Sequence, residues 1–584
     1  MRVNNGYLTA GGTGPGELII HANQAMTIGA NMVDNGSESV RLTVGGYSDS
    51  ERTVVLSGAN SYSGETVIND GVRLHIISPQ AVPADNDLIV NGGEYHVILP
   101  VADVIGLGSL TLQQGGVINR NGTDSGINAD SYLLEDGVIA VELHGIGPAI
   151  KFTEGIVHLS AGEDNSAYSG SIQIDEGILS VEDRRSLGTG TVVVNPFGRL
   201  VLNTAVVEGN VVLMGGELSA VRTSSIEPDF VGNLTVASNS TIFLVSGLSK
   251  DGSGSGEFRI SGAIDGDADL TVTGFQFGNG LTLAGNNSQY SGDIVVESGG
   301  LEVHGPMSLG TGQTIIQADA QIDVLTDVQA GSILLDGGRL RSLQIERSIN
   351  VPLHFSDRSE LEHVFTLRLN GGSEFMDDSR VIKVREGATV ISDVTQVSGE
   401  GTLEILEGGV VFGGTITPTV PDARLSVLGA SLMDFQASID LGNGGDLGLM
   451  FDGQIADIAI DATGQSLSGS GVLSANLALE NGGTISPGSS VGAMTINGAA
   501  TIADGQYQWE IMDALGVPGS GWDWADIAET LTLAATLDDP FVLSIVGLGA
   551  NDQPGSVVNF DNEDDYEWLM LSASDIVGFN PAAI

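Results

Sequence analysis

Glycine recurs along this chain about every twenty residues, and short apolar runs flank it on both sides. The stretches LIVNGGEYHVI, LLEDGVIAVEL and IQIDEGILSV each read as a strand, a tight turn and a second strand, with no helical pattern between them. A parallel β-helix requires such a pattern, because one coil cannot bury its own inward residues and must stack on the next coil, about 4.8 Å away. One glycine from each of eight successive corners gives Gly71, Gly92, Gly115, Gly137, Gly155, Gly177, Gly198 and Gly216, with steps of 21, 23, 22, 18, 22, 21 and 18 residues.

Composition supports an all-β chain. The 584 residues include 84 glycines, 41% are hydrophobic and 16% are charged, which is too apolar for a disordered polymer and too rich in glycine for a helical protein. We therefore predict a single-stranded parallel β-helix over residues 1–500, with coils of roughly twenty residues. Tryptophan occurs only beyond residue 500, and we expect residues 501–584 to form a distinct all-β segment that caps the last coil.

The charge argues against nucleic acid as a partner. With 21 Lys and Arg against 74 Asp and Glu, the net charge of −53 repels a phosphate backbone. No apolar run is long enough for a transmembrane segment, and the start MRVNNGYLTAGGTG lacks the charged and apolar regions of a signal peptide. The chain has no cysteine, so no disulfide framework holds it together, which is compatible with an oxidising exterior.

A second repeat lies on top of the coil pattern. LSGANSYSGETVIND, residues 56–70, has partial copies that begin at Leu159 and Leu283, and SLGTG follows the tyrosine of the last two copies by eighteen residues. Three copies of one packing device are more plausible than three catalytic sites, and we expect each tyrosine ring to cover a coil edge with its hydroxyl in water. The motif positions are Gly58, Asn60, Tyr62 and Gly64, then Asn165, Tyr168 and Gly170, then Asn287, Tyr290 and Gly292.

The unit L-x-G-x-N-x-x-Y-S-G-x-x-x-I closely resembles the autotransporter-associated β-strand repeat of bacterial passenger domains. The stretch GSGVLSANLALENGGTISPGSSVGAMTINGAATIADGQYQWEI is similar to the last coils of such passengers. The resemblance implies a β-solenoid and a segment of a longer surface protein without its signal and anchor. It says little about activity.

Two stretches suggest catalysis. Residues 488–492, GSSVG, fit the G-x-S-x-G nucleophile elbow, but the alternating AMTINGAATI that follows predicts a strand where that elbow needs a helix. The stretch HFSDRSELEH gathers acids, bases and a cation, as a polysaccharide lyase or hydrolase would need, although a solvated face of ordinary charges explains it better. Its ionisable residues are His354, Asp357, Arg358, Glu360, Glu362 and His363.

Metal binding and local ion pairs complete the candidate sites. Two acidic loops, DGDADL and DNEDDYE, place carboxylates close enough to share a Ca²⁺ ion, although neither has EF-hand spacing and no cofactor is required by the sequence. We expect the basic pair in VEDRRSLGTG to bind the acids just before it, Glu182 and Asp183. The candidate calcium ligands are Asp265, Asp267 and Asp269, and Asp561, Asp564 and Asp565.

The sequence therefore predicts a non-enzymatic, extracellular β-solenoid at the bacterial cell surface, acting as an adhesin, a structural rod or a fibre that assembles head to tail. The expected partners are a surface glycan or another cell-surface ligand, and further copies of the chain. The competing hypothesis is a polysaccharide-active lyase or hydrolase on the same scaffold, because β-helices serve both roles. A third is a glycan-binding rod stiffened by calcium.

Overall fold

The computed structural model describes residues 1–47, 52–121, 125–160, 165, 167–221, 227–245, 257–274, 280–342, 345–549 and 551–584. Within these residues the chain forms strands β1 to β58 and three short 3-10 helices, and it contains no α-helix. No described helix is long and apolar enough to cross a membrane. The 3-10 helices are η1 (Pro79–Ala81), η2 (Ala430–Leu432) and η3 (Pro581–Ala583).

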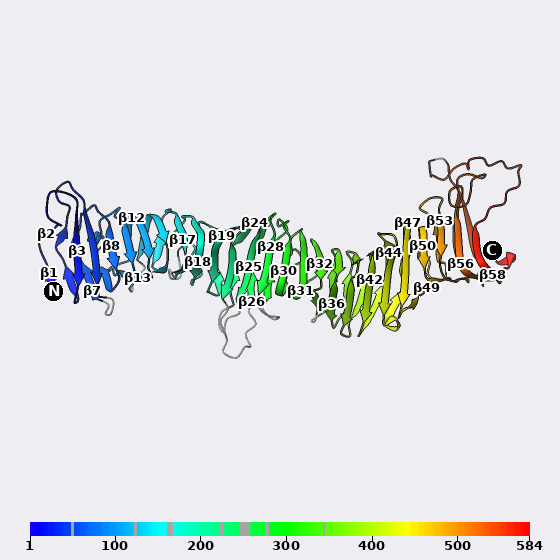
Figure 1. Cartoon of the computed structure of the whole chain (residues 1–584), viewed down its shortest axis with the longest axis horizontal. Helices are drawn as coiled ribbons and strands as arrows, with labels where there is room; N and C mark the ends of the chain where they lie inside the picture. The colour runs from blue at the N-terminus through cyan, green and yellow to red at the C-terminus, as the bar shows by residue number, and fades with distance from the viewer. Residues whose placement is uncertain are drawn as a thin grey trace. The chain divides into compact units, whose positions relative to one another are not determined.

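The strands pair in parallel with the strand one coil earlier and the strand one coil later, so the chain is a parallel β-solenoid, as predicted (Figure 1). Leu88, for example, lies between Thr66 and Leu110, at offsets of 22 residues in both directions. The example strands are β8 (Thr66–Asn69), β10 (Leu88–Asn91) and β12 (Val104–Gln113) on one face, and β9 (Val72–Ile76), β11 (Glu94–Val97) and β13 (Gly116–Arg120) on the next.

The chain divides into two compact units, residues 1–301 with 307–312 and residues 302–306 with 313–584. In the first unit, inward side chains from successive coils stack in files. One file consists of Val44, Ile68, Val90, Leu112 and Leu134, all at most 3% exposed. Burial of each such side chain contributes roughly 1.5–3 kcal/mol, which makes these files the main source of stability.

Coils of the second unit carry three strands, one on each of three faces. Each face is a stack of parallel strands. The first face stacks β32 (Ser332–Asp336), β35 (Leu353–Ser356), β38 (Ser373–Met376), β41 (Val394–Ser398), β44 (Thr415–Pro418) and β47 (Ser438–Phe451); the second stacks β33 (Arg339–Ser342), β36 (Arg358–His363), β39 (Arg380–Val384), β42 (Glu400–Ile405) and β45 (Ala423–Leu428); the third stacks β34 (Arg347–Ile349), β37 (Leu367–Leu369), β40 (Ala388–Ile391), β43 (Gly409–Phe412) and β46 (Met433–Phe435).

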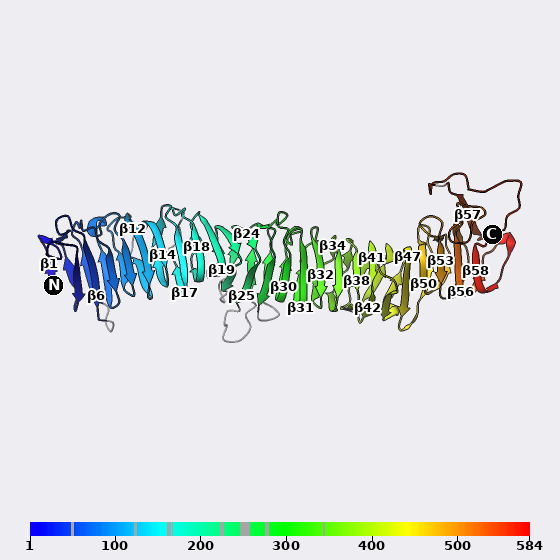
Figure 2. The same ribbon diagram turned by 45° about the horizontal axis from the view of Figure 1, so that its top comes forward.

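Parallel stacking continues past residue 500. The loop that joins the last two strands projects from them (Figure 2). Hydrogen bonds from two aromatic side chains fix the end of this loop. Trp522 Nε1 donates to the Leu569 carbonyl at 2.9 Å, and the Tyr507 hydroxyl donates to the Met570 carbonyl at 3.0 Å. The capping role of residues 501–584 stays a prediction. The strands are β55 (Gly505–Ile511), which pairs with β57 (Phe541–Gly547), and β56 (Trp524–Leu533), which pairs with β58 (Leu571–Val577).

Two lysines lie inside the solenoid, a position that was not predicted from the sequence. Lys151 follows Leu134 in an inward file, is fully buried and donates from Nζ to the carbonyls of Thr153 and Glu176. Lys383 lies between Leu361 and Ile405 in another file and donates to the carbonyls of Arg385 and Glu407 at 2.8 and 2.9 Å. Both ammonium groups bind carbonyl oxygens at the coil corners.

Candidate functional site: the repeated coil junction

The asparagine of the repeat joins three successive coils. Asn165 is fully buried, and its Oδ1 accepts a hydrogen bond from Leu143 N of the preceding coil at 2.8 Å while its Nδ2 donates to Ser186 O of the following coil at 2.8 Å. Both ends of the amide are thereby satisfied, as a buried polar group requires. The same two contacts occur at Asn60, with Met32 N at 2.8 Å and Ala81 O at 2.6 Å, and at Asn287, with Ile264 N at 2.9 Å and Ser308 O at 2.6 Å.

The tyrosine hydroxyls are buried, so the prediction that they lie in water is wrong. Each ring is at most 1% exposed. The Tyr168 hydroxyl donates to Gly147 O and the Tyr290 hydroxyl to Ala268 O, both at 2.9 Å in the preceding coil. Burial raises the pKa of both phenols, so they remain neutral donors. In the first copy the Tyr62 hydroxyl instead shares a 2.7 Å hydrogen bond with Thr66 Oγ1.

The glycine after Tyr-Ser is required by close approach of two coils. A Cβ on Gly170 would lie 2.2 Å from Gly147 O, and one on Gly292 would lie 2.0 Å from Ala268 O. Gly64 and Gly58 are restricted in the same way, at 2.6 Å from Val40 O and 2.4 Å from Ala30 O. None of the four has a positive φ, so the space between coils, and not the backbone angle, selects glycine here.

The SLGTG echo is the part of the following coil that packs on the tyrosine. Thr189 N donates to Tyr168 O and Thr311 N to Tyr290 O, both at 2.8 Å, and Ser186 and Ser308 are fully buried. The motif and its echo therefore form one junction that spans three coils. Every described polar contact of the motif's asparagine and tyrosine side chains is internal, so the junction is structural.

The residues of HFSDRSELEH do not converge on one site. The outward His354 bonds Glu374 at 2.6 Å, and Glu362 is 3.0 Å from Arg385. His363 is fully buried, with Nε2 2.8 Å from Thr389 Oγ1, and burial lowers its pKa to about 4. Glu360 and Glu362 lie on one face of β36 and share Arg339, at 3.2 and 3.4 Å, so both carboxylates are held in ion pairs. Of the remaining residues, Asp357 lies at a corner with φ +48°, Arg358 is exposed, and Glu360 is 3.2 Å from Arg339.

The GSSVG turn joins two strands, β52 (Thr484–Pro487) and β53 (Ala493–Ile496), so the strand predicted after the turn is confirmed and the helix of a nucleophile elbow does not follow. The buried Asp523 holds the turn by accepting a hydrogen bond from Gly492 N at 2.8 Å, and it also accepts one from Glu510 N at 2.8 Å. Burial raises the pKa of Asp523 to about 8.

Arginines are paired with acids on neighbouring coils. Both Arg184 and Arg185 contact Glu208, at 2.6 and 3.0 Å, and lower the pKa of its carboxyl. The expected pairing of both with Glu182 and Asp183 is therefore wrong for Glu182, which bonds His158 at 2.7 Å. Similar pairs join Arg73 to Glu94 at 2.7 Å, Arg120 to Glu142 at 2.8 Å, Arg341 to Asp323 at 2.5 Å and Arg380 to Glu404 at 2.5 Å.

The candidate calcium ligands differ in their surroundings: Asp265 lies in strand β27 (Ile264–Gly266) with a buried Oδ1 that has no hydrogen-bond partner among the described residues, whereas other ligands accept backbone hydrogen bonds. Asp269 accepts from Asp293 N at 3.1 Å, and Asp561 accepts from Glu563 N at 3.0 Å. No group of three or more acidic or histidine side chains in the described ranges is arranged to hold a metal ion. Weak calcium binding through Asp265, Asp267 and Asp269, or through Asp561, Asp564 and Asp565, stays a prediction without a defined ligand set.

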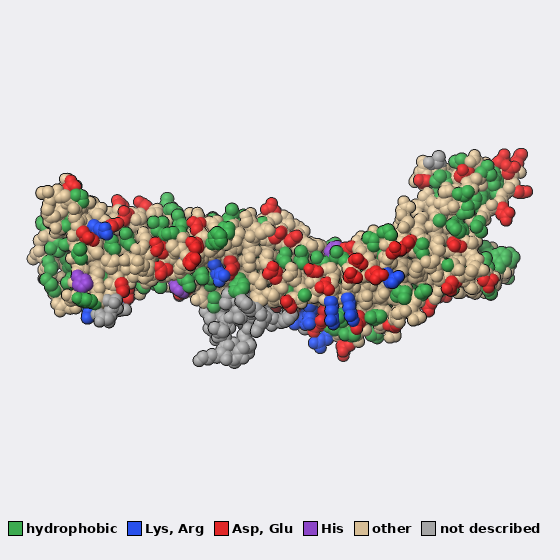
Figure 3. Space-filling view, in the orientation of Figure 1, with side chains coloured by type: hydrophobic (Ala, Val, Ile, Leu, Met, Phe, Trp, Pro, Cys, Tyr) green, Lys and Arg blue, Asp and Glu red, His purple; other side chains and the backbone are tan. Residues whose placement is uncertain are grey.

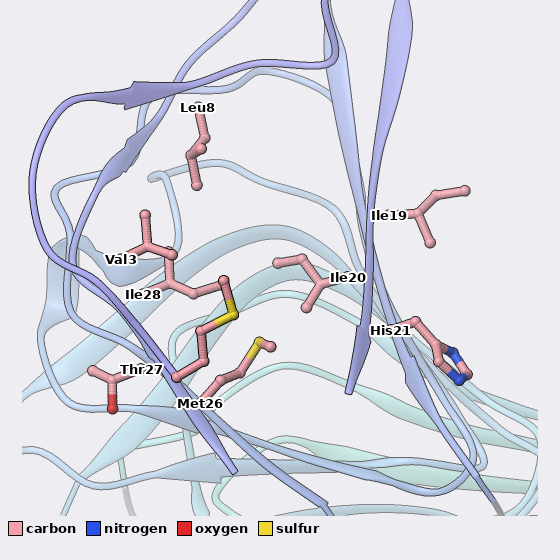
Figure 4. Close-up of a pocket in the computed structure, with 9 residues that line it drawn as sticks. Val3, Leu8, Ile19, Ile20, His21, Met26, Thr27 and Ile28 are labelled. Atoms are coloured by element: carbon pink, nitrogen blue, oxygen red, sulfur yellow. The ribbon is translucent and has the colours of Figure 1, made fainter. Parts of the chain in front are cut away.

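Two apolar cavities lie at the first and last coils. The first, of about 250 Å³, is lined mainly by hydrophobic side chains of β1, β3 and β4, among them Val3, Ile20 and Met26 (Figure 4). The second, of about 370 Å³, is lined by Leu531, Leu533, Phe541, Leu571, Ile576, Phe579 and Ile584. Neither brings together groups for acid–base chemistry. The strands of the first cavity are β1 (Arg2–Val3), β3 (Gly16–Ala22) and β4 (Met26–Ile28).

Comparison with known proteins agrees with this architecture. The passenger-associated-transport-repeat family matches residues 52–72 and 279–303, which contain the Tyr62 and Tyr290 copies of the motif. An adhesin autotransporter, BmaC, of Brucella suis biovar 1 (strain 1330) is 33% identical over 149 residues, which is 25% of this chain and 4% of that protein. The chain thus spans a small part of that relative's length. No solved structure matches the chain significantly. With its three junctions of one design in a parallel solenoid, the chain resembles the repeat proteins of autotransporter passengers.

Proposed function

We propose that this chain is an extracellular passenger segment at the bacterial surface that serves in adhesion or as a structural spacer, without enzymatic activity. The observation that carries the proposal is the use of polar side chains between coils: the buried Asn165, Tyr168 and their counterparts, and the Arg–Glu pairs, stabilise the stack. A scaffold of this kind holds surface side chains at fixed spacing. The similarity to a protein named as an autotransporter adhesin supports the same role.

The polysaccharide-active alternative has no comparable support. Three ionisable residues of HFSDRSELEH, His354, Glu360 and Glu362, are held in ion pairs with neighbouring coils. We do not propose a reaction.

Adhesion is tested with the purified chain on beads. Beads that carry the chain should attach in a saturable manner to a subset of glycans on an array or to a subset of cell surfaces, and soluble chain should compete. Beads that carry the chain heat-denatured are the control. Attachment no greater than that of the control on every surface would refute an adhesive role and leave the spacer role.

We also propose that copies of this chain associate head to tail. In the described residues β57 and β58 each have a parallel partner on one side, and an apolar cavity of about 370 Å³ opens beside them. Unpaired edges and uncovered apolar surface favour addition of another coil. Because the contact joins two different ends, it would produce open filaments.

Negative-stain electron microscopy over a range of concentrations tests assembly. We expect filaments that shorten on dilution and that Ile576→Asp abolishes, because Ile576 lines the cavity and is 48% exposed. Val394→Asp, at an outward position 38% exposed on β41, is the control and should leave filaments intact. Single particles at all concentrations would contradict assembly.

A further inference from the structure

A column of aromatic rings runs from the core of the second unit to its surface, through Trp509, Trp568, Tyr566 and Phe560. Successive ring centroids are 5.6, 5.1 and 5.4 Å apart, and Tyr566 and Trp568 are nearly parallel, at 8°. Trp509 is 1% exposed, whereas Phe560 is 52% exposed. We call Phe560 and Tyr566, with the loop residues between them, the column tip.

Hydrogen bonds hold the column tip in place. Trp568 Nε1 donates to Ala514 O at 3.0 Å, Asp561 N donates to the Tyr566 hydroxyl at 2.8 Å, and that hydroxyl donates to Asn559 O at 3.2 Å. Anchoring of the loop explains Trp568 and Tyr566. It does not explain why the large hydrophobic ring of Phe560 lies beyond them in water. A ring held in a fixed position loses little conformational entropy when it binds a partner.

Carboxylates surround the column tip, and no cation of the chain is nearby in sequence. Residues 425–584 contain 22 Asp and Glu and no Lys, Arg or His. Elsewhere arginines neutralise acids on the next coil, as between Arg380 and Glu404. Figure 3 shows hydrophobic and acidic side chains together, without Lys or Arg, on the loop that projects beyond β57. The exposed acids of the tip are Asp561, Glu563, Asp564 and Asp565, and the exposed Glu567 follows it.

We propose that the column tip binds an extended basic peptide segment of a partner protein, with an arginine as the main contact. A guanidinium stacks on an aromatic face and pairs with a carboxylate through two parallel hydrogen bonds, and the tip provides both groups. Leu515 and Val517, which are 72% and 62% exposed, follow Ala514 and offer apolar surface to the stems of basic side chains. The excess of acidic residues in 425–584, 22 Asp and Glu without a Lys, Arg or His, attracts a cationic partner and repels an acidic one.

This inference rests on the proposed adhesive role for its biological meaning, but it is tested separately. The full chain is titrated into a fluorescent nonapeptide of three Arg-Gly-Ser repeats at about 0.15 M salt, where surface charges beyond about 8 Å are screened. Fluorescence anisotropy reports binding. A peptide with citrulline in place of arginine is the neutral control.

Three variants locate the site. Phe560→Leu removes the aromatic face but keeps an apolar side chain, and Asp564→Asn with Asp565→Asn removes two charges at the tip. The matched control is Asp538→Asn with Asp539→Asn, which removes two exposed charges from a loop of the same cation-free region. We expect the first two to weaken binding about fivefold or more and the control less than twofold. Thermal melting of each variant checks that the fold is kept.

Equal weakening by all variants, binding of the citrulline peptide, or no saturable binding would overturn the inference. Self-association that requires Phe560 without any peptide would also overturn it, because the occupant would then be a second copy. Absence of peptide binding together with intact bead adhesion would refute this inference alone. Peptide binding without adhesion would refute the adhesive role alone.

Discussion

Replacement of Asn287 by alanine tests whether the repeat asparagine stabilises the coil junction. The Asn287 side chain is 1% exposed, accepts from Ile264 N at 2.9 Å and donates to Ser308 O at 2.6 Å. Alanine removes both partners and leaves a backbone donor and a backbone acceptor in a buried place. A buried polar group that loses its partner costs about 1–3 kcal/mol, so the expected loss is about 2–6 kcal/mol at this junction.

Hydrogen exchange measures the loss where it occurs. In a solenoid each coil contacts only its neighbours, so we expect a local effect instead of a uniform fall in stability. A loss of about 2 kcal/mol corresponds to roughly 30-fold faster exchange through local opening, because about 1.4 kcal/mol is a factor of ten. The Ile264 amide, which donates to Asn287, should show it directly. Peptides from coils far from the junction should exchange as in the unchanged protein.

The adjacent Asn286 provides a matched control. It is exposed, and its side chain accepts only a 3.2 Å bond from Ser288 N among the described contacts. Asn286→Ala should change exchange at Ile264 less than threefold, which corresponds to about 0.6 kcal/mol. If Asn287→Ala and Asn286→Ala have equal effects, the asparagine does not join the coils as the structure indicates.

Three further perturbations have expected directions. Gly292→Ala should lower stability by more than about 2 kcal/mol, since a Cβ would lie 2.0 Å from Ala268 O, whereas Gly106→Ala, with open space around it, should be neutral in chemical denaturation. Burial lowers the pKa of His363 to about 4, so as pH falls the unfolded chain binds a proton on this imidazole before the folded chain does. The free energy of unfolding at this coil should therefore fall by up to about 3 kcal/mol between about pH 6.5 and pH 4. His363→Gln should remove this pH dependence. Burial raises the pKa of Asp523 to about 8, so the folded chain binds the carboxyl proton more tightly than the unfolded chain does. The folded state should therefore lose stability as pH rises from about 4 to 8. Amide exchange around the 488–492 turn should become faster over this range, after correction for intrinsic rates. A pH profile that is flat, or that changes in the opposite direction, would contradict the role given to His363 or to Asp523.

The coil step was predictable from sequence because a single residue type marks the corners. Gly71, Gly92 and Gly177 have φ of +75°, +76° and +75°, which other residues rarely adopt. Gly198 is a corner of a different kind: its φ is not positive, but a Cβ there would lie 2.3 Å from Ile174 O. Sequence spacing identifies both kinds and does not separate them, since the close approach depends on the neighbouring coil.

Contacts between coils were harder to predict. Arg184 pairs with Glu208, 24 residues later, because one coil step brings residues about twenty apart side by side. The sequence-based prediction instead paired both arginines with acids of the same stretch. Lys151 occupies the inward phase of AIKFTE, two residues after the buried Ala149, and this alternation was the available signal for a buried lysine. Because lysine usually lies at the surface, this signal did not lead to a prediction that Lys151 is buried.

The distribution of charge differs before and after Arg424. In the first part it contributes to the stack of coils, and in the last part it favours binding of a basic partner. Up to Arg424, most of the chain's cations lie in pairs between coils, so salt should weaken the outer faces of the stack only modestly, because exposed pairs contribute about 0–1 kcal/mol each. Beyond Arg424 the sequence has no Lys, Arg or His, no ion pair among the described residues includes the acids of this part, and they repel one another. A basic partner at the column tip would relieve that repulsion, so binding should stabilise the last coils as well as occupy the tip. Hydrogen exchange of β57 and β58 with and without the arginine peptide would separate this coupling from simple surface attraction, because only a coupled site would protect the strands behind the loop.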